Sequence, residues 1–432
     1  MKNIFFLMLV SFGIVAGAKA QFSISAEYRP RLEINRGYVN LPVDTSQTQV
    51  YITHRARLNF NYAMEKFSFR LSMQDIRTWG DGDVASKTGV FGSTRGIDIY
   101  EAWMSWHMNE KSYLRLGRQE IRIDDERLIS WRNWNQWGLT YDAVRYNYAY
   151  DGWEFNAVGS YNNRDMHFGA PSLAGEDYYT SVNRIKTQNF LHLKRRFSHR
   201  FSASLIALGT GFLSPDQPNT IYMMGTYGVW MGAKAGGFDG TLNAYYQNGM
   251  SQTGKEISAF MFTVNPGYNI GNVRIGAGLD YISGDDAESD DYGQKVKTFN
   301  KMYGTQFKYY GWMNYFTFMQ GSTKNGGLLD IYPNLQIALA KKHKLAAYYH
   351  LFSLANPVML SSGVEDDLSL GSEIDLMYTY KPSTEVTLQA GFSYYLVSDT
   401  MEKIKGIGVG NAETPYWAWV MITFKPVLFT SK

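Results

Sequence analysis

The stretch from Val50 to Ala63 alternates without a break between apolar and polar side chains. Because successive side chains of a β-strand point to opposite faces, one face of this strand is apolar and the other carries two arginines. A strand of this kind suits a wall between hydrocarbon and water better than a wall around a dry core. The pattern therefore predicts a transmembrane β-barrel. One parity holds Val50, Ile52, Ala56, Leu58, Phe60 and Tyr62, and the other holds Tyr51, Thr53, Arg55, Arg57, Asn59 and Asn61.

The same half-apolar alternation recurs along the chain, and two kinds of connection separate the strands. Tight turns are expected near 65–66, 109–110, 151–152, 198–199, 236–237, 266–267, 342–343 and 382–383. Long loops are expected over 35–46, 79–96, 121–139, 162–182, 209–219, 248–254, 284–330, 356–367 and 398–413. About eight short and about nine long connections predict an all-β, antiparallel, up-and-down barrel of about 18 strands. Its short turns would be periplasmic and its long loops extracellular.

One aromatic segment, residues 304–320, does not fit this count. It contains Tyr309, Tyr310, Trp312 and Tyr315, which is rich enough in aromatic side chains for a strand. One further strand would make the number odd, whereas bacterial barrels have even numbers. We therefore predict that 284–330 is one long excursion with a short helix, folded over or into the mouth of the barrel. A further hairpin is the alternative.

The first 20 residues predict the compartment. Lys2 is followed by an apolar run from Ile4 to Gly17 and by the small residues Ala18 and Ala20, the pattern of a secretory signal peptide. The run is shorter than the ~20 residues that a membrane-spanning helix needs, and no longer apolar run follows. We expect a signal peptide at 1–20 and a single barrel domain at 21–432, located in the outer membrane of a Gram-negative bacterium with its outer face in contact with lipid.

Composition agrees with the barrel and excludes several functions. Aromatic residues make up 16% of the chain, yet its mean hydropathy is only −0.30, because a barrel needs apolar residues on one face of each strand. The chain has no cysteine, which excludes disulfides, zinc–thiolate sites and thiol nucleophiles. A net charge of +3 gives no reason to expect nucleic-acid binding.

Charged residues on the polar faces are the candidate pore lining. Arginine guanidinium groups bind carboxylates in a bidentate fork, so arginines in a narrow lumen would attract anions. Glu27, Glu33, Glu101, Glu373 and Asp375 share this parity, so the alternative is that the arginines only form pairs across the lumen. His350 could also face the lumen; a neutral imidazole hydrogen-bonded to a strand neighbour is the preferred interpretation. The predicted lining is Arg29, Arg31, Arg55, Arg57, Arg70, Arg115, Arg145, Glu101 and His350.

The segment from Leu114 to Leu128 reads LRLGRQEIRIDDERL and is followed at 134–145 by WNQWGLTYDAVR. These residues resemble the G-R-Q-E and T-F-D-x-x-R motifs of the alginate export family of outer-membrane porins. Further matching pieces lie at 281–286, 309–311, 349–352 and 370–375, so the resemblance covers most of 22–425. It implies an eighteen-stranded barrel with a positively lined pore for anionic polysaccharide or smaller solutes, and periplasmic export partners. By position, it adds Arg118, Arg127 and Asp142 to the candidate pore residues and supports Arg145.

Enzymatic and metal chemistry find little support in the sequence. An outer-membrane phospholipase would place His and Ser side by side on one strand face, but none of the seven histidines has Ser two residues on. The acidic run Asp285, Asp286, Glu288, Asp290 and Asp291 lacks the central Gly and closing Glu of an EF-hand loop, so it is interpreted as a solvated loop. We predict no catalytic residue, metal or cofactor.

Two functions of different class follow from these observations. The first is a porin-like channel for the passive passage of anionic solutes, including acidic polysaccharide or oligosaccharide, through an arginine-lined lumen. The second is a structural or surface-binding barrel whose loops 284–330 and 79–96 close the lumen.

Overall fold

A computed structural model describes residues 20–79, 97–162, 185–214, 217, 220–305 and 307–431. The expected signal peptide, apart from Ala20, and most of the predicted loops 79–96 and 162–182 lie outside the described residues. The strands of the first half are β1 (Gln21–Arg36), β2 (Gln49–Ala63), β3 (Phe67–Thr78), β4 (Asp98–Asn109), β5 (Ser112–Gln119), β6 (Tyr141–Tyr150), β7 (Trp153–Tyr161), β8 (Ile185–Arg196), β9 (Phe201–Leu213) and β10 (Ile221–Ala235). Those of the second half are β11 (Phe238–Met250), β12 (Glu256–Ile270), β13 (Val273–Ile282), β14 (Leu328–Ala340), β15 (His343–Ser353), β16 (Val358–Leu360), β17 (Gly363–Glu365), β18 (Ser369–Tyr380), β19 (Val386–Val397), β20 (Tyr416–Phe424) and β21 (Val427–Thr430).

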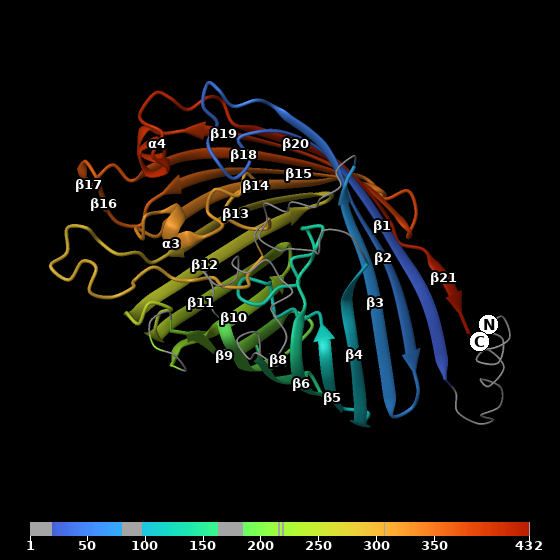
Figure 1. Ribbon diagram of the computed structural model, residues 1–432. Coiled ribbons are helices and arrows are strands. Elements are labelled where there is room, and N and C mark those ends of the chain that lie inside the picture. Colours follow the sequence, from blue (N-terminus) through green and yellow to red (C-terminus); the bar gives the residue numbers. More distant parts are fainter. Residues whose placement is uncertain are drawn as a thin grey trace, which may run out of the picture.

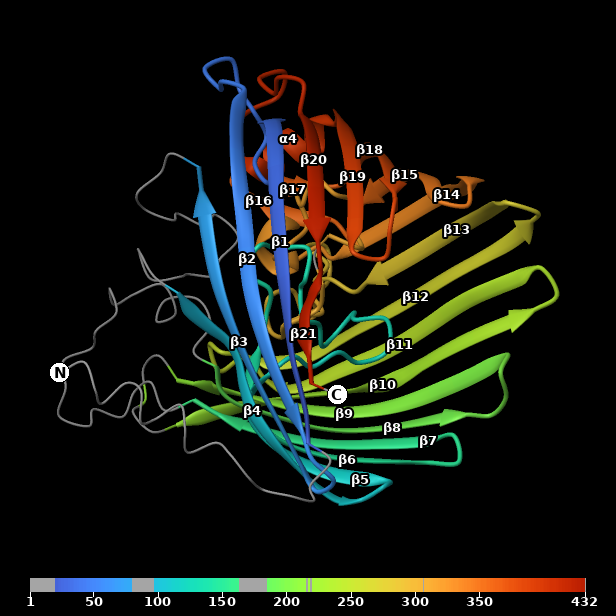
Figure 2. The ribbon, with the colours of Figure 1, turned by 90° about the vertical axis from the view of Figure 1, so that its right-hand side faces the viewer.

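The strands form one closed antiparallel barrel (Figures 1 and 2). Each strand pairs with the next, and β1 closes the sheet by pairing with β2 on one edge and with β20 and β21 on the other. Because β20 and β21 follow one another along the same edge of β1, they act as one strand of the barrel, and the 19 strands of the sheet form an 18-strand barrel. The predicted architecture is confirmed. The small strands β16 and β17 form a separate hairpin within a long connection.

The alternation read from the sequence separates two environments. Outward positions carry large exposed apolar side chains, such as Leu191 (54% exposed) and Phe238 (65%), as contact with lipid requires. Inward positions on β1 and β2 carry charged side chains, and the register places Glu27 opposite Arg57 and Arg29 opposite Arg55. Within the described residues, no helix has the length and apolar character that a membrane crossing requires.

One predicted turn is wrong. Pro266 and Gly267 lie inside β12, and the chain turns five residues later at Gly271 and Asn272, where Gly271 adopts a φ of 58°. The pairs between β12 and β13 stop at Val264 and resume at Gly267, so Pro266, which has no N–H, lies where these two strands are not paired. The other tight turns fall where the sequence predicts them.

The aromatic segment 304–320 is part of one excursion between β13 and β14, as expected, and it does not form a strand pair. The excursion, residues 283–327, contains the short helix α3 (Met319–Ser322), and Tyr310, Tyr315 and Phe316 are almost fully buried. The segment is therefore rich in aromatic residues because these side chains pack inside the protein, not because they contact lipid. A second helix, α4 (Asp399–Lys405), lies in the connection between β19 and β20; the Ser398 hydroxyl caps it by accepting a hydrogen bond from the Met401 N–H.

Strand β21 completes the closing seam beyond the aromatic Phe424. It pairs with residues 23–25 of β1, and the N–H groups of Ala26 and Ser431 donate to the carbonyls of Pro426 and Phe22. We predict that truncation after Phe424 lowers the stability of the folded barrel by about 2–4 kcal/mol, at ~1 kcal/mol for each lost hydrogen bond. The barrel still assembles, because β20 keeps its pairs with β1.

The measurement is the temperature at which the compact form is lost on SDS gels. The control is Lys425→Gln, which removes the ion pair between Lys425 and Glu27 (3.3 Å) but leaves the ladder intact. An unchanged transition in the truncated chain would contradict a role for β21 in the seam.

Candidate functional site

Two loop segments enter the barrel and form the candidate site. The first, called the crossing loop, is residues 120–140 between β5 and β6; the second is the 283–327 excursion (Figures 1 and 2). Polar contacts join the crossing loop to several separate parts of the barrel wall. An extended loop inside a barrel must satisfy its own backbone polar groups, and here wall side chains do so.

Asp124 fixes one end of the crossing loop to β8 and β9. Its carboxylate accepts hydrogen bonds from His192 Nε2 (3.1 Å), Lys194 Nζ (3.0 Å) and Ser204 Oγ (2.5 Å). Burial would raise the pKa of Asp124, but the contacts with His192 and Ser204 and the charge of Lys194 outweigh it and lower that pKa below its ordinary value. The neighbouring Asp125 accepts a hydrogen bond from Asn243 on β11 (2.8 Å).

Arg127 fixes the middle of the crossing loop to β13. Its two terminal nitrogens bind the two oxygens of Asp280 at 2.9 and 2.8 Å, and both side chains are at most 1% exposed. The guanidinium also lies 3.7 Å from the centre of the Tyr309 ring, which belongs to the excursion. This buried fork therefore joins the wall and both inward loops.

Four arginines predicted to line the pore fix the other end of the crossing loop to β1 and β2. Arg29, Arg31, Arg55 and Arg57 are all buried, and each donates to backbone carbonyls of residues 133–137. Two of them also form ion pairs. Arg55 pairs with Glu27 on the neighbouring strand, and Arg31 pairs with Glu33 two residues along its own strand. The contacts to the loop include Arg29 Nη1 to Asn133 O (2.6 Å), Arg31 Nη1 to Trp134 O (3.1 Å), Arg55 Nη1 to Gln136 O (3.2 Å) and Arg57 Nη2 to Trp137 O (2.9 Å).

The excursion is held against the barrel wall by Glu373 of β18. This carboxylate accepts hydrogen bonds from the backbone N–H groups of Trp312 and Met313. Gly311 has a φ of 75°, and a Cβ there would lie 2.4 Å from a Glu373 oxygen, so only glycine fits this turn.

Direct contacts join the two inward loops into one unit. The Trp134 ring stacks on Phe307 with centroids 3.6 Å apart, and Arg132 donates to the carbonyls of Gly304 (3.1 Å) and Met302 (2.7 Å). A displacement of either loop would therefore disturb the other.

His350 faces inward, as predicted, but it is buried in the wall. Its Nδ1 lies 2.9 Å from Asp330 Oδ1, its Nε2 lies 3.7 Å from Asp375, and its ring stacks with Tyr332 and Phe352. This geometry agrees with an imidazole hydrogen-bonded to a strand neighbour.

The remaining inward charges lie between the crossing loop and the short turns. Arg70 pairs with Glu101 at 2.5 Å. Arg115 and Arg145 are direct partners across β5 and β6; Arg115 Nε donates to Ser105 (2.8 Å), and Arg145 Nε donates to Asn156 (3.0 Å). Neither of these two arginines has a carboxylate within 4.0 Å in the part of the chain that the structure describes.

Arg118 and Asp142 differ from our expectation because they face outward. They share the parity of the exposed residues Leu116 and Val144, and they bind each other at 2.9 Å with side chains 45% and 64% exposed. Arg115 and Arg118 are three positions apart on one strand, so the period of two places them on opposite faces. The resemblance to the family motif does not indicate on which face of the strand Arg118 lies.

Sequence reasoning missed Asp124, Lys301 and the loop carbonyls that the arginines bind. These lie in loops, where no periodicity marks burial.

The acidic run 285–291 forms local contacts, such as the ion pair of Asp291 with Lys297 (2.6 Å). No described group of three or more His, Asp or Glu residues is arranged to hold a metal.

A family model described as alginate export matches residues 20–406 of this chain. The chain belongs to the alginate export family. A comparison with curated protein sequences gives no match. The family and its fold are those of porin-like outer-membrane transport barrels, which places this protein in the outer membrane of a Gram-negative bacterium.

Solved porins share the fold of this alginate export family member at low sequence identity. OpdK of Pseudomonas aeruginosa, solved with vanillate, gives a TM-score of 0.59 at 11% identity over 96% of this chain and 99% of that chain. OccK9 (OpdG) of the same organism gives 0.59 at 14% identity over 94% and 98%. OccK3 (OpdO), also from Pseudomonas aeruginosa, gives 0.59 at 12% identity over 94% and 96%.

Two substitutions test whether the Arg127–Asp280 ion pair holds the crossing loop. We predict that Arg127→Met costs about 3–5 kcal/mol, because it leaves Asp280 buried without its partner. Arg118→Met removes a fork of nearly the same geometry from the outer face. Arg118 and Asp142 lie one residue from the loop ends of β5 and β6, where water reaches them, so the change should cost about 0–1 kcal/mol. Thermal unfolding in detergent, followed by tryptophan fluorescence, measures both. Equal losses would show that Arg127 does not hold the loop.

Lys301 of the excursion predicts a pH dependence of stability. Burial, and next the nearby charges of Arg132 and Arg127, lower the pKa of Lys301 from 10.5 to about 7. The unfolded chain therefore binds more protons than the folded one between about pH 7 and 10.5, and the contribution of this group to stability rises with pH across that window. We predict that Lys301→Met stabilises the barrel most at or below pH 7 and flattens the rise in melting temperature toward pH 10.

Thermal melts of both proteins at pH 6 and pH 10 check this expectation. The control is Lys344→Met, at an exposed position of β15. A pH profile that Lys301→Met leaves unchanged would mean that this lysine is not held uncharged in the folded barrel.

Proposed function

We propose that this alginate export family member is a channel for the passive passage of anionic solutes, including acidic oligosaccharide or polysaccharide. The observation that carries the proposal is the Arg115–Arg145 pair. These side chains are partners on neighbouring strands, face inward, and bind neutral oxygens of Ser105 and Asn156. No described carboxylate lies within 4.0 Å of either guanidinium, so the two adjacent groups offer an anion a bidentate site.

Arg115 and Arg145 support this proposal more strongly than the other predicted arginines do. Arg29, Arg31, Arg55 and Arg57 are occupied by loop carbonyls, Glu27 and Glu33, and Arg70 is paired with Glu101. We therefore assign anion attraction to the part of the lumen on the short-turn side of the crossing loop. Lipid would surround the outer face, and a periplasmic export partner would approach the short turns at this end.

A plugged barrel is the second candidate, and the inward loops favour it. The crossing loop and the excursion are held by buried contacts such as Arg127–Asp280 and by the Trp134–Phe307 stack. In that case the protein would be a structural or surface-binding barrel. The 80–96 part of the loop that was also expected to close the lumen lies outside the described residues.

Planar bilayers distinguish the two functions. We expect discrete conductance steps and a reversal potential shifted toward the anion. The double variant Arg115→Gln/Arg145→Gln should lower the anion-to-cation permeability ratio about two- to fivefold, because it removes two lumen charges from the local field. Arg118→Gln, on the outer face, is the control and should leave the ratio unchanged.

Two results would contradict the proposal. Cation selectivity of the wild-type channel, or an unchanged ratio in the double variant, would overturn the assignment to these arginines. No conductance, with the crossing loop present or shortened, would support the plugged barrel.

A further inference from the structure

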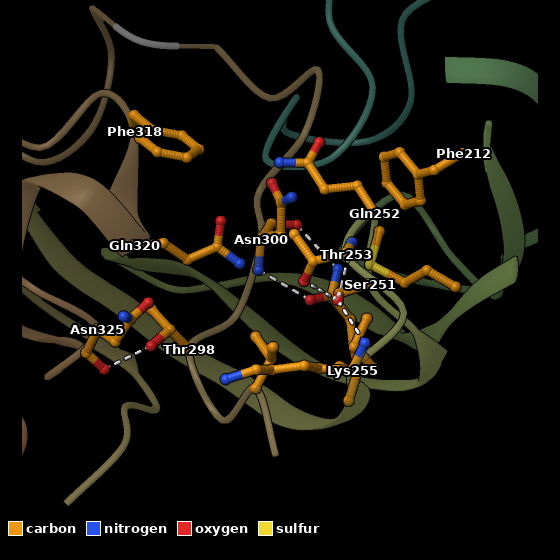
Figure 3. A pocket seen from close by; sticks show the side chains of 14 residues that line it. Phe212, Ser251, Gln252, Thr253, Lys255, Thr298, Asn300, Phe318, Gln320 and Asn325 are labelled. Atoms are coloured by element: carbon orange, nitrogen blue, oxygen red, sulfur yellow. Dashed lines mark hydrogen bonds between the residues drawn. The ribbon is translucent and has the colours of Figure 1, made fainter. Parts of the chain in front are cut away.

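A cavity of about 420 Å³ lies at the long-loop end of the barrel, away from the Arg115–Arg145 pair. Figure 3 shows the side chains that line it. Its floor is the inner face of β9 to β12, where Phe212, Met224 and Ile257 are buried. Its other side is the excursion, which contributes residues between Val296 and Asn325. The cavity therefore opens between the barrel wall and the folded-in loop, and its size is that of a small-molecule site.

Hydrogen bonds fix the walls of the cavity. Gln247 of β11 and the backbone of Asn300 form a reciprocal pair: Gln247 Nε2 donates to Asn300 O, and Asn300 N donates to Gln247 Oε1, both at 2.8 Å. The excursion also pairs with β12, since Val296 N donates to Glu256 O (2.8 Å) and Ser258 N donates to Val296 O (3.0 Å). The site is thus formed before any ligand arrives, which lowers the cost of binding.

The lining has spare hydrogen-bonding capacity and almost no charge. The side-chain amides of Gln252 and Gln320 form no hydrogen bond within the described residues, and Figure 3 shows them reaching into the cavity from opposite sides. The Phe318 ring stands at the rim and is 44% exposed. Among the described residues of the lining, Lys255 alone is ionisable, and its Nζ donates to the Gly293 carbonyl (3.2 Å).

We propose that this cavity binds a neutral saccharide unit. A sugar ring presents several hydroxyl groups, each a donor and an acceptor, and a primary amide offers two donors and an acceptor to match them. The ring also has an apolar C–H face that packs on an aromatic side chain such as Phe318. The one lysine of the described lining already donates its Nζ to the Gly293 carbonyl, so the cavity favours a neutral ligand over a charged one. A lipid chain would leave the amides of Gln252 and Gln320 unpaired.

The inference deepens the proposed channel function and rests on it. The cavity is a docking site at the mouth for a glycan-bearing solute, and its neutral lining differs from the two arginines on the short-turn side. The channel would then contact a sugar ring at one end of the lumen and an anionic group at the other.

The test probes the full-length barrel in nanodiscs with an array of fluorescent oligosaccharides, both neutral and uronate-containing. We expect binding of at least one neutral oligosaccharide, and a tenfold or greater loss of its affinity in Phe318→Ala/Gln320→Ala. Met359→Ala, at an exposed position of the β16–β17 hairpin, is the matched control and should bind as wild type. Lys255→Ala should retain the neutral ligand.

Three outcomes would overturn the inference. They are no binding of any neutral oligosaccharide, undiminished binding in the double variant, and binding of uronates alone with loss in Lys255→Ala. Conductance and anion selectivity, measured without glycan, test the proposed channel function independently of the sugar site. Phe318→Ala/Gln320→Ala should leave both unchanged, so failure of the sugar site and failure of the channel give different results.

Discussion

The structure depends on the binding of loop backbone carbonyls by arginines of the barrel wall. A barrel of 18 strands is too wide for its inward side chains to fill, and the chain's own loops occupy part of the lumen. Loop carbonyls brought out of bulk water need donors, and a guanidinium supplies up to five of them from one side chain. Arg29 alone reaches the carbonyls of Asn133, Trp134 and Asn135. The arginines of β1 and β2 therefore make an irregular loop inside the lumen compatible with a stable barrel.

The charged residues of the crossing loop bind to separate parts of the wall. Asp124 contacts cationic and polar side chains of β8 and β9, whereas Arg127 contacts the carboxylate of Asp280 on β13. Each buried charge meets an opposite charge or a hydrogen-bond donor, which is the condition for offsetting the cost of desolvation. Because the Trp134–Phe307 stack joins this loop to the excursion, both loops form one packed unit.

The sequence predicts the wall well and the interior poorly, for a physical reason. Strands of a membrane barrel face lipid on one side and the lumen on the other, so the alternation along a strand indicates the side on which each residue lies. It places Arg55 inside the barrel and Arg118 outside. The turn at Pro266 fails because a proline can stay inside a strand where the ladder is interrupted. Contacts such as Arg29 with Asn133 exist only after the barrel closes, and loop residues carry no period that reveals them. The aromatic richness of 304–320 does signal burial, although it does not identify the partners.

Because of the loop contacts, the number of inward arginines does not by itself measure how strongly the lumen attracts anions. An arginine that is bound to carbonyls and carboxylates contributes little net field to a passing solute, because the carboxylates and carbonyl dipoles offset its charge and the loop separates it from the solute. Only arginines with neutral partners leave an uncompensated charge, and Arg115 and Arg145 have such partners. They lie between the short turns and the crossing loop, whereas the described lining of the cavity at the other end contains one lysine. A uniform arginine ladder is therefore not needed for anion attraction, since the crossing loop divides the lumen into two parts of different chemistry.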